Sequence, residues 1–214
     1  YAIVITVVLL VCFYIFKIFC YSVVFHIFII LHFSTFFKID FRAHACDLSA
    51  FSDKSFDIVL NMGPYYHLTE KALREQCISE CLRVLKPNGL LAITYISRYF
   101  IFPFIATGNT EYLLNDLGNQ LVNTGTLRHD SPNCFWTDTY YASPQEMEQL
   151  LRNHSLEIVD HFAQDGISTT LGEKIDRLND EQFNIWCDYH YKTCREKSIL
   201  GASNHSMIIG RKVK

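Results

Sequence analysis

The sequence predicts an α/β domain with a mainly parallel sheet and flanking helices, beginning near residue 38. Between residues 39 and 96 the patterns run strand, strand, helix, Pro-Gly turn, strand, an order typical of this class. The chain has 214 residues, 50% hydrophobic and 19% charged, with a net charge of -3. This composition excludes a disordered tail and a basic nucleic-acid coat, and the length supports one domain or one domain with an anchor.

Residues 1–37 form a separate apolar segment in which Lys17 is the only formal charge. The segment is long enough to cross a bilayer, since a spanning helix needs about 20 mostly apolar residues. It is rich in β-branched and aromatic residues, which is unusual for a helix, and it begins at Tyr1 rather than Met. Two interpretations stay open: a transmembrane helix, and a mis-joined stretch read from T-rich non-coding sequence at the start of a fragment.

The first half of the predicted domain, 38–214, contains three strands and a helix. Residues 39–45 alternate as a strand does, and residues 56–61 are a short apolar run of the buried type. Thr69 offers an N-cap for a helix that ends before the turn at 87–89, and residues 90–96 form the next buried strand. One face of this helix carries apolar or small residues at 73, 77, 78, 81, 82 and 85.

The second half begins with a capping box at 143–146, which opens a helix to about residue 153. Residues 156–162 predict a strand, 180–195 a helix and 206–210 a final strand. The intervening residues 98–140 have mixed composition, and we interpret them as an insertion that lies above the sheet as a lid.

The numbers of cysteines and of charged residues indicate which partners and which cellular compartment to expect. The eight cysteines include no C-x-x-C pair, so we expect no metal site and a reducing, cytoplasmic location for the domain, anchored to a membrane if residues 1–37 are genuinely translated. With 19 basic against 22 acidic residues there is no basic stripe, which disfavours nucleic acid as a partner.

Three segments, 47–49, 56–68 and 82–90, together resemble class I S-adenosylmethionine-dependent methyltransferases with a Rossmann-like fold, nearest to the group labelled methyltransferase type 11. The resemblance extends over about residues 39–214. It implies S-adenosylmethionine as the cofactor and methyl transfer to a small-molecule acceptor as the activity.

The resemblance also implies which residues contact the cofactor, because ligands bind at the carboxyl ends of the strands in this kind of sheet. His44 stands where the family usually has an acidic residue that contacts the adenine amino group. The backbone groups of Ala45 and Cys46 would then contact the adenine ring, with Asp47 beside them. The turn after the strand at 56–61 lies against the methionine end, where a glycine allows close approach. The implied cofactor-binding residues are His44, Ala45, Cys46, Asp47, Asn61, Met62 and Gly63.

On the acceptor side the resemblance implies that Tyr65 and Tyr66 line the mouth of the site. His67 is the candidate general base, since the ordinary pKa of histidine lies near neutrality, although a structural histidine is an open alternative. Arg98 is either an ordinary surface charge or a contact to an anionic acceptor.

One part of the family pattern is missing from residues 1–38, which contain neither a G-x-G turn nor a carboxylate for the ribose. The sequence therefore resembles an N-terminally incomplete enzyme, without the usual first strand, and we expect it to bind the cofactor poorly or not at all. A membrane-tethered, non-catalytic binding module is the alternative. If the cofactor interpretation holds, Ala45, Asn61 and Gly63 surround a common hollow.

Overall fold

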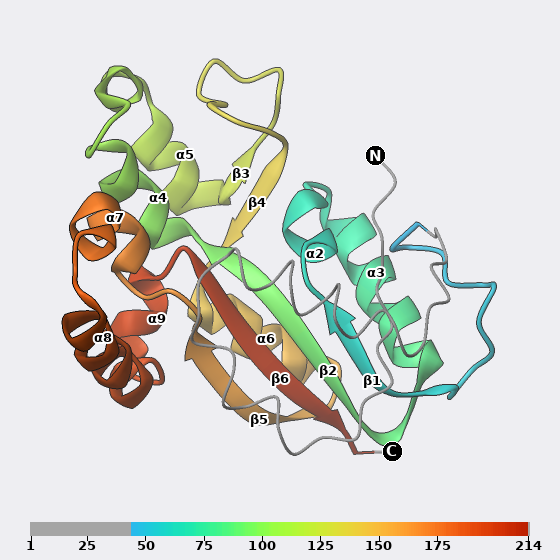
Figure 1. The fold of residues 1–214 in the computed structure, drawn as a ribbon. Coiled ribbons are helices and arrows are strands. Elements are labelled where there is room, and N and C mark those ends of the chain that lie inside the picture. Colours follow the sequence, from blue (N-terminus) through green and yellow to red (C-terminus); the bar gives the residue numbers. More distant parts are fainter. Residues whose placement is uncertain (1–43, 214) are drawn as a thin grey trace.

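A computed structural model describes residues 44–213 (Figure 1). The apolar segment 1–37 and most of the strand predicted at 39–45 lie outside the described residues. Within them, His44 pairs with Asp47 in an isolated bridge that closes a tight turn. No helix among the described residues is long and apolar enough to span a membrane.

A six-stranded sheet lies at the centre of the fold. β2 pairs in parallel with β1 and, at its last residues, with β4, whereas β6 pairs antiparallel with β2 and β5. The predicted Rossmann-like α/β fold with flanking helices is confirmed, and the strand directions in the described part are mixed. The strands are β1 (Phe56–Asn61), β2 (Leu85–Ser97), β3 (Thr126–Leu127), β4 (Thr139–Ala142), β5 (Leu156–Ala163) and β6 (His205–Lys212).

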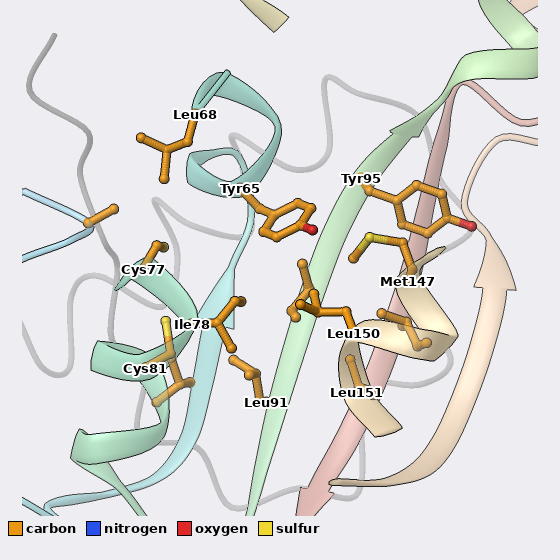
Figure 2. Close-up of a cluster of buried hydrophobic side chains, with 14 of the residues drawn as sticks. Tyr65, Leu68, Cys77, Ile78, Cys81, Leu91, Tyr95, Met147, Leu150 and Leu151 are labelled. Atoms are coloured by element: carbon orange, nitrogen blue, oxygen red, sulfur yellow. The ribbon is translucent and has the colours of Figure 1, made fainter. Parts of the chain in front are cut away.

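Helices α3 and α6 pack on the same face of the sheet and form the main core. Side chains from both helices meet those of β2 in one buried cluster, as Figure 2 shows. Each fully buried aliphatic side chain there contributes about 1.5–3 kcal/mol through removal of apolar surface from water. The helices are α2 (Pro64–His67), α3 (Lys71–Val84), α4 (Arg98–Ile105), the 3-10 helix η2 (Thr110–Leu114), α5 (Leu117–Thr124), α6 (Pro144–Asn153), α7 (Ser168–Asp176), α8 (Asp180–Thr193) and α9 (Lys197–Ala202).

Local sequence signals fix most of these elements. The predicted capping box opens α6: the Ser143 hydroxyl accepts from the Glu146 N–H at 3.2 Å, and the Glu146 carboxylate accepts from the Ser143 N–H at 2.6 Å. Two details of the prediction are wrong. The residue that caps α3 is Glu70, without a side-chain hydrogen bond, and the turn at 87–89 lies inside β2, where Asn88 takes a φ of 63°.

Residues 98–140 form α4, η2, α5 and β3 and pack around a second buried cluster of their own. This cluster joins the end of β2 to the helices, and its members are Ile96, Phe100, Ile101, Ile105, Leu117, Leu121, Leu127 and Tyr141. Movement of this segment as a lid stays a prediction.

A buried imidazole on β5 makes the stability of the fold depend on pH. His161 is 8% exposed, and its Nε2 lies 2.9 Å from the Tyr95 hydroxyl. Burial lowers the pKa of His161, and this outweighs the opposing effect of Glu148. The unfolded chain therefore binds a proton first, at about pH 6.5, so the free energy of unfolding falls as pH drops below this value and levels off below the folded-state pKa.

We expect urea unfolding to show this loss between about pH 7 and about pH 5. The variant His161→Gln removes the titrating group, so it should show a shallower slope over the same range. Equal slopes in the two proteins would contradict the assignment.

Candidate functional site

The carboxyl ends of β1 and β2 lie at one edge of the sheet, because the two strands run in parallel. Gly63 and α2 follow β1 at this edge, and His205, the first residue of β6, pairs with Ile96 near the end of β2. Three segments distant in sequence therefore meet where the sequence analysis places the ligand.

Tyr66 is at the centre of this edge. Its ring lies 4.7 Å from the His67 ring and 6.0 Å from the His205 ring, measured between centroids. Gly63 has a φ of 127°, and a Cβ there would come within 3.7 Å of the Tyr66 hydroxyl. Burial raises the pKa of Tyr66, so the phenol stays protonated at neutral pH. We call Gly63, Tyr66, His67 and His205 the edge cluster.

His67 is half-buried, and its Nδ1 lies 3.2 Å from the Asp138 carbonyl oxygen. A carbonyl only accepts, so Nδ1 donates this hydrogen bond and Nε2 of the neutral ring keeps its lone pair. This is the tautomer that a general base acting through Nε2 needs. The catalytic role of His67 stays a prediction.

Tyr65 lies in the core rather than at the mouth of the site, which corrects the prediction for this residue. It is 5% exposed and points into the main cluster (Figure 2), with its ring 6.1 Å from that of Tyr140. The two tyrosines are adjacent on one short helix, so they face different directions and only Tyr66 joins the edge cluster.

The Asn61 side chain is engaged inside the protein. Its Nδ2 donates to the Cys77 sulfur at 3.2 Å, and its Oδ1 accepts from the Tyr65 N–H at 3.1 Å. This arrangement joins β1 to α3 and leaves the backbone of the following turn, with the 39% exposed Met62, for a ligand.

Residues 44–47 also bond internally, against α3. The Cys46 N–H donates to His44 Nδ1 at 3.2 Å, and the Cys46 carbonyl accepts from Gln76 at 2.9 Å. Ala45 and Cys46 are buried, and burial raises the pKa of Cys46 to about 11. A hollow of about 490 Å³ beside this segment is lined by Cys46, Asp47, Ser49, Gln76, Ser79, Glu80 and Arg83. Ala45, Asn61 and Gly63 do not line it, so the common hollow expected around these three residues stays a prediction.

Arg98 is not an ordinary surface charge, which corrects that interpretation, whereas its contact to an anionic acceptor stays a prediction. The side chain is 9% exposed, and its Nη2 donates to both carboxylate oxygens of Glu146, at 2.8 and 2.6 Å. Its other nitrogens donate to the Tyr141 and Val122 carbonyls at 3.2 and 3.1 Å. Arg98 therefore joins α4 to β4, α5 and α6.

The sequence analysis missed the pairing of His205 with Asp165. His205 Nδ1 lies 3.4 Å from the Asp165 carboxylate, although the two residues are 40 positions apart. The residue types alone give no signal of this contact. Among the described residues, no group of three or more His, Cys, Asp or Glu side chains is placed to hold a metal ion.

The edge cluster fits one end of S-adenosylmethionine. That cofactor carries a positive sulfonium, and the face of a tyrosine ring attracts cations, so Tyr66 beside Gly63 suits the sulfonium. The described residues offer a poorer match to the adenine end of the cofactor. Because His44 Nδ1 accepts a hydrogen bond, Nε2 of the neutral ring donates, and it does not replace a carboxylate that accepts from an amino group.

Comparisons with known proteins find similar sequences among the methyltransferases. Residues 32–93 match the sequence model of the methyltransferase domain family. The chain is 32% identical over 125 residues to the ubiquinone biosynthesis O-methyltransferase of Bartonella bacilliformis, covering 58% of this chain and 44% of that protein. It is 34% identical over 119 residues to the protein of the same name from a Chelativorans species, covering 56% and 40%.

A solved structure of an S-adenosylmethionine-dependent methyltransferase from Methanosarcina mazei aligns with 80% of this chain and 65% of its own, with a TM-score of 0.48 and 17% identity. The chain spans less than half the length of the two ubiquinone biosynthesis relatives. From residue 32 to residue 93, the chain is similar to the methyltransferase domain family.

Proposed function

We propose that this protein transfers a methyl group from S-adenosylmethionine to an oxygen of a small-molecule acceptor. The proposal is supported mainly by the family match, which includes β1, Gly63 and α2. The Tyr66 ring of α2 lies beside the rings of His67 and His205 at the edge of the sheet where the carboxyl ends of β1 and β2 lie. The names of the relatives support an oxygen as the methylated atom.

The protein's contribution to such a reaction is mainly alignment. The backbone of Met62 and Gly63 and the Tyr66 ring would hold the cofactor, which supplies an electrophilic methyl group when bound. The rings of Tyr66 and His67 are half-buried, and an imidazole of the edge cluster would take the acceptor proton.

We further propose that this chain binds the cofactor weakly. The Asn61 amide and the Cys46 backbone groups already have partners inside the protein, and His44 does not supply an acceptor for an adenine amino group. The non-catalytic, membrane-tethered alternative concerns residues 1–37, which lie outside the described residues.

Calorimetry with S-adenosylhomocysteine tests both proposals. We expect a dissociation constant between about 10 µM and about 1 mM. Gly63→Val should raise it at least about tenfold, because a branched side chain is strained at a φ of 127° and would occupy the space beside the Tyr66 hydroxyl. The control is Gly108→Val, since a Cβ at Gly108 meets nothing within 4 Å. Absence of binding up to about 1 mM would contradict methyl transfer and favour the non-catalytic module.

A further inference from the structure

His205 and Asp165 form an imidazole–carboxylate pair at the edge of the sheet. The Asp165 carboxylate lies 3.4 Å from His205 Nδ1, and it also accepts the backbone N–H of His205 at 3.2 Å. A carboxylate in this position favours the proton on Nδ1 and leaves the Nε2 lone pair free to accept.

The carboxylate is itself held in place. The Ser203 hydroxyl, which is fully buried, lies 2.6 Å from Asp165 Oδ1, and it accepts the Gly166 N–H at 2.9 Å. Asp165 is thus held by the Ser203 hydroxyl and the His205 backbone N–H, and its side chain is 25% exposed. Enzymes commonly orient a general base through a hydrogen bond to a second group whose own position is fixed by further contacts.

His205 is reachable from solvent, with its side chain 35% exposed. Within residues 44–213, its Nε2 makes no hydrogen bond, and its ring faces Tyr66 across 6.0 Å. The titratable groups packed against it are Asp165 from the turn after β5 and Tyr66 from α2, whose ring also lies beside that of His67.

We propose that His205 is the general base of the reaction and that Asp165 is its positioning residue. This inference rests on the proposed function. As the acceptor oxygen forms its bond to the methyl carbon, the methyl–sulfur bond breaks and its electron pair stays on sulfur, while the acceptor's hydroxyl proton passes to His205 Nε2. His67 lies in the same cluster, but its Nδ1 bonds to a neutral carbonyl, whereas the carboxylate beside His205 stabilises the imidazolium that forms.

The first test needs no turnover. Long-range proton–nitrogen NMR spectra of the full chain should show His205 protonated on Nδ1, and this preference should be lost in Asp165→Asn. Catechol, a simple phenol, should shift the His205 Nε2 resonance in the presence of S-adenosylhomocysteine. An unchanged tautomer in Asp165→Asn, or a catechol shift at His67 with none at His205, would overturn the assignment.

The second test measures methyl transfer from S-adenosylmethionine to catechol as a function of pH. His205→Gln should lower kcat by about 100-fold or more, since a general base contributes about 10²–10⁴-fold, and should leave KM for S-adenosylmethionine unchanged. The fall in rate toward acid pH should disappear with it. Asp165→Asn should also lower kcat, but by a smaller factor than His205→Gln.

The matched control is His154→Gln, which removes another imidazole–carboxylate pair, His154 with Glu75 at 3.0 Å, from outside the edge cluster. It should leave kcat and the pH profile unchanged. A loss in His154→Gln equal to that in His205→Gln would reduce His205 to a structural role. If S-adenosylhomocysteine binds and His205 does not respond to catechol, this inference alone fails. If S-adenosylhomocysteine does not bind, the proposed function fails and this inference fails with it.

Discussion

Replacement of Gly125 by alanine should lower the free energy of unfolding by about 3 kcal/mol, the largest loss expected at any single glycine here. Gly125 ends α5 with a left-handed φ of 63°, and its N–H donates to the Gln120 and Leu121 carbonyls. A Cβ at this position would collide with the Tyr141 carbonyl oxygen and lie 2.7 Å from the Arg98 guanidinium. Both obstacles belong to the packed junction between α5 and β4, so neither moves without loss of other contacts.

Urea unfolding measures this loss, and Gly108→Ala is the control. A Cβ at Gly108 meets nothing within 4 Å, and its backbone is not left-handed, so the change there should stay within about 0.5 kcal/mol. Equal stabilities for the two variants would mean that the left-handed turn at Gly125 does not form as described.

Replacement of Arg98 by methionine should also lower the free energy of unfolding by about 3 kcal/mol. Methionine keeps the apolar stem of the side chain, but it leaves the Glu146 carboxylate without its cation and the Tyr141 and Val122 carbonyls without their donor. The loss reflects these unpaired groups rather than the ion pair alone.

Two variants separate these contributions in urea unfolding. Glu146→Gln keeps an N3 side chain able to complete the capping box, so it should lower the free energy of unfolding by less than Arg98→Met does. Arg177→Met breaks an ion pair between side chains that are 78% and 87% exposed, and should cost no more than about 0.5 kcal/mol. A similar loss in Arg98→Met and Arg177→Met would contradict the burial of Arg98.

The sequence predicted those elements whose signals are local. The capping box at Ser143, helix α3 and the short apolar run of β1 each depend on residues within a few positions of one another, so pattern and propensity were sufficient. The predicted apolar face of α3 was wrong at Leu73, which is 38% exposed. The turn at 87–89 shows the limit of this approach. Its residues suit a chain reversal, yet the pairing of β1 with β2 continues across it.

The candidate site was only partly predictable, because side-chain direction depends on tertiary packing. Tyr65 and Tyr66 are neighbours in sequence, yet one lies in the core and the other at the sheet edge. Arg98 and Glu146 are 48 positions apart, and His205 and Asp165 are 40 apart, and neither pair has a sequence motif. The position of the site at the carboxyl ends of β1 and β2 was predictable, since it follows from strand order.

The pairing of β2 with three other strands has a consequence for how the protein opens. Fraying of β2 would break its backbone hydrogen bonds to β1, β4 and β6 together. We therefore expect the amide hydrogens of β2 to exchange with deuterium only when a large part of the sheet unfolds, which is a rare event. The segment 98–140 touches the sheet mainly through the end of β2 and through β4, and smaller, more frequent openings suffice to expose its amides. We therefore expect the segment 98–140 to open on a shorter timescale than the sheet that supports it.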